Sequence, residues 1–102
     1  MLPPASLLSV IAGLALLSAP ASARTWAGGV NMIAACQEQH GGVWQAILNC
    51  DKCNAYDWMC YDPDTGEWAS VDVNAYCAQT YGGGAYADPQ GGGPYDWGCY
   101  FP

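Results

Sequence analysis

The longest apolar run of the chain lies near its N-terminus. Residues 7–17 are nearly all apolar, and no charged side chain occurs in residues 1–23. The run ends in small residues, and Ala21 and Ala23 have the spacing that signal peptidase recognises. It is shorter than the ~20 apolar residues that a transmembrane helix needs. We therefore predict a secretory signal peptide over residues 1–23, followed by a single small cysteine-rich domain over residues 24–102.

Beyond the signal, apolar and polar positions fall into two series, each of which opens with a helical pattern. The first helix is expected to begin near Val30 and to end before Gly41, because glycine tolerates the left-handed backbone just past a helix end. In the second series, Ser70 or Asp72 can cap the start of a helix and Gly82 can end it. The residues that share one face of the first helix are Val30, Ile33, Ala34 and Gln37.

Strand patterns follow the first predicted helix. Residues 43–48 and residues 56–61 are each predicted to form a strand. Residues 62–66 have the composition of a turn, so that residues 67–68 begin a returning strand. In the second series, residues 82–94 hold six glycines and two prolines, and we predict a loop there.

An octapeptide occurs twice in the chain. Residues 56–63 (YDWMCYDP) and residues 95–102 (YDWGCYFP) match at six of eight positions. A weaker match lies upstream of each copy, where Val, Ala, Cys and two Gly coincide between residues 30–42 and residues 71–83. We therefore predict two tandem copies of one supersecondary unit, over about residues 30–63 and 71–102.

Six cysteines lie in the exported part, and in an oxidising compartment they are expected to form three disulfides. Spacing alone does not choose among the 15 possible pairings. Because equivalent cysteines should form equivalent bonds, the repeat favours one helix–strand bridge in each unit and one bridge within the Cys-x-x-Cys motif. These bridges are Cys36–Cys60, Cys77–Cys99 and Cys50–Cys53. A rival pairing stays open, with the bridges Cys36–Cys50, Cys53–Cys60 and Cys77–Cys99.

The exported part has a small stock of aliphatic side chains. It holds nine residues of the Val, Ile, Leu and Met class, against five Trp, seven Tyr and one Phe. Chains of this size are marginally stable without covalent crosslinks. We therefore predict a small disulfide-rich α+β fold, in which two tandem helix–strand or hairpin units are stapled by three disulfides and rest on aromatic burial.

The charge balance excludes several classes of partner. Nine acidic and two basic residues give a formal net charge of −7. Arg24 and Lys52 alone cannot neutralise a row of phosphates, which excludes nucleic-acid binding. The same deficit argues against docking on anionic lipid after the signal is removed. We expect a monomeric protein whose partner is an extracellular protein, a basic one for example, or a glycan.

The repeated octapeptide also supplies candidate ligand-binding residues. Strand alternation would turn Asp57 and Tyr61 to the face opposite the buried cysteine, and Asp96 and Tyr100 likewise in the second copy. Aromatic faces stack on sugar rings, and carboxylates accept hydrogen bonds from hydroxyls. The two pairs therefore predict a two-point glycan site. The alternative is that these tyrosines cover a thin core or pack between the units.

Cys50 and Cys53 provide the candidate for redox or metal chemistry. A Cys-x-x-Cys pair can be a redox dithiol, although such motifs usually work from a helix start and this one follows an apolar strand. With Cys60 and His40 the pair would also make a four-ligand zinc set. Export favours disulfides over thiolates. We therefore predict a structural bridge and keep a small redox or metal-binding protein as the alternative function.

The residue types of the exported part give little support for a catalytic function. Ser70 and His40 are the one serine and the one histidine of the exported part, so a Ser-His-Asp set would have to use both. Residues 62–67 resemble the opening of a calcium loop, but residue 73, where the bidentate glutamate belongs, is a valine. We predict no catalytic residues, no metal site and no cofactor.

The overall pattern resembles the broad class of small secreted cysteine-rich microbial proteins, effector-like proteins among them. The segment from Cys36 through Gly41 and Gly42 to Cys50 is also similar to small exported bacterial domains, in which a helical cysteine precedes Gly-Gly and a cysteine-bearing hairpin. The resemblance implies export and a helix-plus-hairpin unit, and it carries over no functional residues. We expect an extracellular location, or the periplasm if the source is a Gram-negative bacterium.

Overall fold

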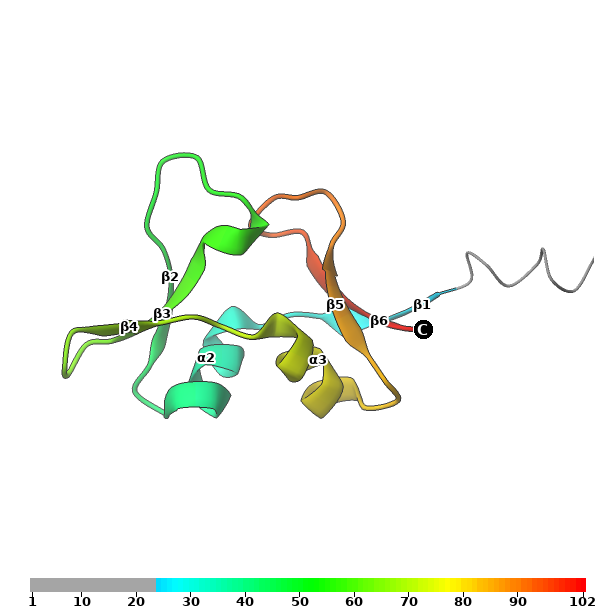
Figure 1. The fold of residues 1–102 in the computed structure, drawn as a ribbon, viewed down its shortest axis with the longest axis horizontal. Helices are drawn as coiled ribbons and strands as arrows, with labels where there is room; N and C mark the ends of the chain where they lie inside the picture. The colour runs from blue at the N-terminus through cyan, green and yellow to red at the C-terminus, as the bar shows by residue number, and fades with distance from the viewer. Residues whose placement is uncertain (1–23) are drawn as a thin grey trace, which may run out of the picture.

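The computed structural model describes residues 24–102 (Figure 1). The predicted signal peptide lies outside these residues. The described part contains two small antiparallel sheets and two nine-residue helices, which confirms the predicted disulfide-rich α+β class. In chain order the elements are β1 (Thr25–Gly29), α2 (Met32–His40), β2 (Gln45–Leu48), the 3₁₀ helix η2 (Ala55–Asp57), β3 (Trp58–Asp62), β4 (Glu67–Ala69), α3 (Val73–Tyr81), β5 (Tyr86–Pro89) and β6 (Trp97–Phe101). Neither described helix is long or apolar enough to span a membrane.

The elements form two units of like construction. The first unit is α2 with the sheet β2-β3-β4, and the second is α3 with the sheet β1-β6-β5. Figure 1 shows α2 and α3 side by side, with the first sheet beyond α2 and the second sheet beyond α3. The loops that precede β3 and β6 meet on the side of the molecule opposite the helices.

The strand that precedes each helix in the chain belongs to the sheet of the other unit. β1 precedes α2 but pairs with β6, the last strand of the chain, whereas β4 precedes α3 but pairs with β3. The registers correspond, since Trp68 lies opposite Tyr61 in the first sheet and Trp26 lies opposite Tyr100 in the second. β1 has one extra residue, Ala27, which is accommodated by a β-bulge. The two units therefore interlock by exchanging a strand, and β1 was not predicted.

Polar side chains and glycines bound the two helices. Asn31 caps α2 and Asp72 caps α3, and each side chain accepts a hydrogen bond of 3.0 Å from the backbone N–H three residues on. Of the two predicted caps of the second helix, the structure uses Asp72. Gly41 and Gly82 end the helices with positive φ, as predicted.

The buried face of the first helix differs from the face that the residue spacing predicted. Ile33 is 55% exposed and Gln37 is also exposed, because α2 begins only at Met32 and turns a different face inward. Each helix buries the first, fourth and fifth of its residues against its sheet. These residues are Met32, Ala35 and Cys36 in α2 and Val73, Tyr76 and Cys77 in α3.

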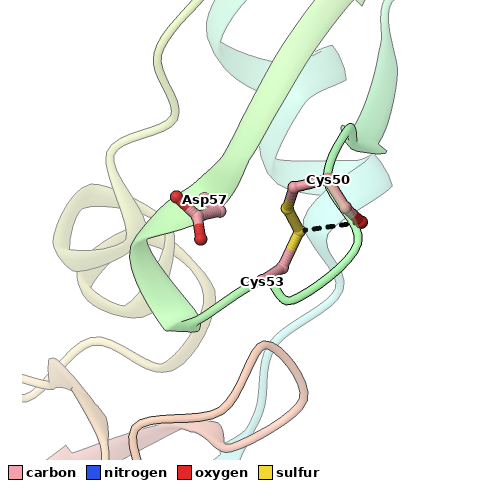
Figure 2. A group of neighbouring side chains, drawn as sticks. All are labelled: Cys50, Cys53 and Asp57. Atoms are coloured by element: carbon pink, nitrogen blue, oxygen red, sulfur yellow. Dashed lines mark hydrogen bonds between the residues drawn. A yellow bond between two sulfur atoms is a disulfide. The ribbon is translucent and has the colours of Figure 1, made fainter.

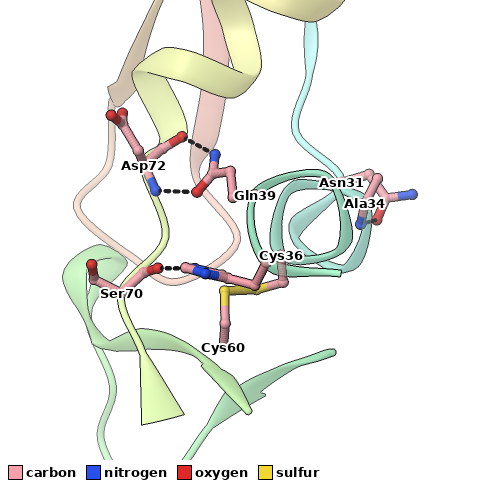
Figure 3. Close-up of a disulfide and its surroundings, with 8 residues drawn as sticks. Asn31, Ala34, Cys36, Gln39, Cys60, Ser70 and Asp72 are labelled. Carbon is pink, nitrogen blue, oxygen red and sulfur yellow. Dashed lines mark hydrogen bonds between the residues drawn. A yellow bond between two sulfur atoms is a disulfide. The ribbon is translucent and has the colours of Figure 1, made fainter. Parts of the chain in front are cut away.

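The three disulfides are the pairs that the repeat favours, and the rival pairing is wrong. Cys36–Cys60 joins α2 to β3 and Cys77–Cys99 joins α3 to β6, with Cα–Cα distances of 5.5 and 5.4 Å. All four of these cysteines are fully buried, and Figure 3 shows the first bridge beside α2. Cys50–Cys53 closes a short loop between β2 and η2. Each unit is therefore stapled through its own core.

Two strand predictions need correction. The strand predicted over residues 56–61 begins only at Trp58, because Asn54 caps the preceding residues as a 3₁₀ helix. The segment 82–94 was predicted to be a loop, but it contains β5. The ladder to β6 and a hydrogen bond of 2.8 Å from the Ala87 N–H to Asn74 Oδ1 hold this strand in place despite its glycine-rich flanks.

Candidate ligand-binding grooves

Trp58 and Trp97 link the two units at the starts of β3 and β6. The indole N–H of Trp58 donates to the carbonyl oxygen of Pro94, and that of Trp97 donates to the carbonyl oxygen of Ala55, each at 2.7 Å. Each acceptor lies in the loop that precedes the other tryptophan's strand. The two bonds hold both indoles in fixed orientations, partly buried between the units.

A tyrosine lies against each of these indoles. Tyr56 meets Trp97 edge to face with ring centroids 5.6 Å apart, and Tyr95 meets Trp58 in the same way at 6.0 Å. Tyr56 is 74% exposed and Tyr95 is 82% exposed. Both tyrosines therefore offer an aromatic ring face to a ligand in solvent.

Two grooves use the same pair of indoles. The first, which we call the Asp72 groove, encloses about 510 Å³ and is lined by Trp58, Trp97 and Tyr56, with residues 70–74 from the start of α3. The second, the Asn31 groove, encloses about 490 Å³ and is lined by both indoles and Tyr95, with residues 30–33 from the start of α2. The two grooves thus draw on corresponding elements of the two units.

The grooves differ in the chemistry of the helix start that lines them. The Asp72 groove is lined by Ser70, Asp72 and Asn74. Because the Asn74 oxygen accepts the bond from Ala87, its amide nitrogen remains available as a donor. The Asn31 groove is lined at its helix start mostly by apolar side chains, those of Val30, Met32 and Ile33.

The predicted acidic candidates hold the loops beneath these tyrosines. Asp57 Oδ2 accepts a hydrogen bond of 2.8 Å from the Asn54 N–H, and Asp96 Oδ2 accepts one of 2.8 Å from the Gly93 N–H. Both carboxylates thus bond to the backbone three residues earlier, an arrangement that fixes the loop before β3 or β6. Neither carboxylate lines a groove.

The predicted tyrosine candidates pack on the two sheets. Tyr61 lies against Trp68 with ring centroids 4.6 Å apart. Tyr100 is buried, at 9% exposure, between Trp26 and Tyr86. Neither tyrosine lines the Asp72 groove or the Asn31 groove, so the structure does not bring the four predicted residues together.

Arg24 is fixed on the second sheet, away from the grooves. Its guanidinium lies 3.8 Å from the centre of the Tyr100 ring and donates to the Tyr86 hydroxyl at 3.3 Å and to Asp88 Oδ2 at 2.5 Å. The bonds to Tyr86 and then Asp88 raise the pKa of Arg24, which stays cationic. Lys52, the other basic residue, is exposed beside Cys53. Both grooves therefore lack a basic lining residue.

The Cys50–Cys53 bridge lies beside the Asp57 carboxylate (Figure 2). One ligand atom from each of these residues lies within 4.8 Å of the other two, and Cys53 Sγ is 3.6 Å from the carbonyl oxygen of Cys50. The zinc set considered as the alternative is not assembled. Cys60 is buried in its bridge to Cys36, while His40 donates to the Ser70 carbonyl oxygen at 2.8 Å.

The groove residues were partly visible in the sequence. Tyr56 and Trp58, with Tyr95 and Trp97, belong to the repeated octapeptide, but the ligand-binding candidates chosen from it were its aspartates and its later tyrosines. The signal that marks them is the Tyr-Asp-Trp triplet that occurs in both copies. Comparison with protein-family models, curated proteins and solved structures finds no match to this chain.

Proposed function

We propose that this is a secreted, non-catalytic binding protein whose ligand is a carbohydrate held in the Asp72 and Asn31 grooves. The observation that carries the proposal is that each groove combines one exposed tyrosine and two indoles with the residues at the start of a helix, Asp72 in one groove and Asn31 in the other. Aromatic faces are large, rigid surfaces on which the C–H face of a sugar ring can pack. Carboxylate and carboxamide groups at the groove wall suit the hydroxyls at the ring edge.

Three disulfides in a chain of this length support the export that the signal peptide predicts. Such bonds persist in oxidising compartments, where small domains use them in place of a large core. An extracellular or periplasmic site of action follows from this proposal, and the ligand is then a glycan met outside the cytoplasm.

The proposal treats the two grooves as copies of one site. The repeat in the sequence and the corresponding registers of the two sheets support this interpretation. Shallow aromatic sites bind single sugars weakly. A polysaccharide or a glycan-coated surface that fills both grooves gains affinity, because the second binding event occurs at a high effective concentration.

Removal of the exposed tyrosines tests the proposal. We expect Tyr56→Ala and Tyr95→Ala each to weaken binding of a glycan identified on an array by about fivefold, the effect of losing one stacked ring. The double variant is expected to lose more than either single variant. Binding is measured by isothermal titration calorimetry.

The matched control is Trp26→Ala, which removes an aromatic side chain of comparable exposure, 57%, outside both grooves. It is expected to leave glycan affinity unchanged. Circular dichroism checks that each variant keeps its fold. An array without bound glycans, or a glycan whose affinity survives loss of both tyrosines, would contradict the proposal. Capture of a basic protein through the same tyrosines would instead support a protein ligand.

A redox function of the Cys50–Cys53 bridge is the second candidate. Cys50 is exposed, and the bridge lies beside the Asp57 carboxylate and a hollow lined by Tyr56 and Trp68. In this function the bridge would accept two electrons and two protons from a substrate dithiol, which would become a disulfide. Exposed disulfides are more readily reduced than buried ones.

Thiol counting under mild reduction tests this alternative. A redox function requires that a dithiol protein reduces the Cys50–Cys53 bridge reversibly, while the two buried bridges stay intact. The same reaction must stop in Cys50→Ser. A bridge that reacts with small reductants only, and is not turned over by protein dithiols, would rule this function out.

A further inference from the structure

We propose that the Asp72 groove binds a sugar ring that carries a protonated amine, whereas the Asn31 groove binds an uncharged ring. This inference rests on the proposed function and names the ligand class of each groove. It depends on one difference between corresponding positions, an aspartate at the start of α3 and an asparagine at the start of α2.

Asp72 is held in place by contacts that leave its charge available. Gln39 of α2 bonds to both backbone groups of Asp72, accepting from its N–H at 2.9 Å and donating to its carbonyl oxygen at 2.7 Å. Figure 3 shows these two bonds, with the carboxylate on the side away from Gln39. One carboxylate oxygen, Oδ1, accepts from the Ala75 N–H, and Oδ2 has no hydrogen-bond partner among the described residues.

The charge of the Asp72 groove is not compensated from nearby. Asp72 forms no ion pair in the described part of the chain, and Arg24 and Lys52 line neither groove. The net charge of −7 adds a long-range attraction for cations. An amine on a ring that packs on the exposed face of Tyr56 would therefore meet a carboxylate that forms no ion pair with a described residue.

The Asn31 groove offers the opposite environment with the same aromatic surfaces. Asn31 caps α2 through its oxygen, at 3.0 Å from the Ala34 N–H, and carries no charge. Met32 and Ile33 lie beside it where Val73 and Asn74 lie in the Asp72 groove. Desolvation of an ammonium group against these apolar side chains would cost free energy, so a neutral or acetylated ring fits better.

A set of three β-linked tetramers, of glucosamine, N-acetylglucosamine and glucose, tests the inference by calorimetry at a pH below the pKa of the amine. We expect the wild-type protein to bind the glucosamine tetramer about fivefold more tightly than the glucose tetramer, the effect of one exposed charge pair. Asp72→Asn should remove most of this preference, and it should lower affinity for the glucosamine tetramer more than affinity for the glucose tetramer. The substitution keeps a good helix cap, because asparagine and aspartate cap equally well.

The reciprocal variant Asn31→Asp is the matched control, since it places the same carboxylate in the other groove. It is expected to raise affinity for the glucosamine tetramer and to lower affinity for the acetylated one. If tetramers bind but Asp72→Asn keeps the full preference for glucosamine, the charge assignment is wrong and the carbohydrate function stands. If no tetramer or other glycan binds, both the assignment and the proposed function are overturned.

Discussion

Each unit holds one helix against three strands, and in both the helix–strand disulfide lies in the same place, at the fifth residue of the helix and the third of the central strand. The last residue of each helix also donates a corresponding hydrogen bond. His40, at the end of α2, donates to the Ser70 carbonyl oxygen, and Tyr81, at the end of α3, donates to the Gly29 carbonyl oxygen, both at 2.8 Å. Corresponding positions thus make corresponding bonds with unlike side chains.

The units differ most in the loops before β3 and β6. The first loop is closed by Cys50–Cys53, while the second contains a run of glycines at residues 91–93. Both loops nevertheless end in the same backbone–carboxylate bond, at Asp57 and at Asp96. The comparison teaches that the same backbone–carboxylate bond precedes the central strand of each unit, whereas the loop that leads to this bond is built in two different ways.

The largest expected effect is the loss of stability when a disulfide is removed, and it should be greater for the two helix–strand disulfides than for the disulfide in the loop. Replacing Cys36 and Cys60 together by alanine should lower the free energy of unfolding by about 3 kcal/mol, and replacing Cys77 and Cys99 should cost about the same, because each bridge closes a chain segment of similar length. The Cys50–Cys53 bridge spans a sequence separation of only 3 and should contribute about 2 kcal/mol or less. Urea unfolding measures all three.

Because the units exchange strands, each double-alanine variant should still unfold in a single transition. Intrinsic tryptophan fluorescence and far-ultraviolet circular dichroism report on both units and should give coincident curves. Two separate transitions would contradict the interlocked architecture. A cost for the Cys50–Cys53 bridge equal to that of the buried bridges would contradict the contrast between core and loop.

The part of the fold that could be predicted from the sequence depends on local signals and on the repeat. The ends of both helices followed from glycines and the start of the second helix followed from its cap residue, whereas the start of α2 was predicted too early. The pairing of Cys36 with Cys60 and of Cys77 with Cys99 followed from equivalence between copies. β1 was not predictable in this way, because a short edge strand derives its stability from its partner strand, and the paired residues here are 69 to 76 positions apart in the sequence.

The bulge explains why the repeat was traced too short. Trp26 and Trp68 occupy corresponding places in the two sheets. The extra residue Ala27 lies between Trp26 and the matched segment that follows, so in the sequence the two tryptophans are out of step with that segment by one position.

The grooves were missed because the conformation before β3 was predicted incorrectly. Tyr56 was assigned to a strand. In the structure it lies in a 3₁₀ helix that Asn54 caps, and its ring contacts Trp97 of the other unit.

A smaller effect is expected at one of the two octapeptide positions where the copies differ. Gly98 of β6 corresponds to Met59 of β3, and a Cβ atom at Gly98 would overlap the ring of Trp26. In the first unit Trp68 lies against Tyr61, and Met59 is accommodated, half-buried. We expect Gly98→Ala to lower the free energy of unfolding by about 2 kcal/mol, the usual cost of overpacking.

Gly29→Ala is the control for this prediction, because Gly29 pairs with Gly98 in the ladder but a Cβ there would meet no atom within 4 Å. It should leave stability nearly unchanged. If the cost of Gly98→Ala arises from the indole, it should shrink when measured in a Trp26→Ala background, and the two substitutions should not be additive. Additive costs would show that the glycine is required by the backbone instead. The difference between the copies would then lie in strand geometry and not in the ring that covers it.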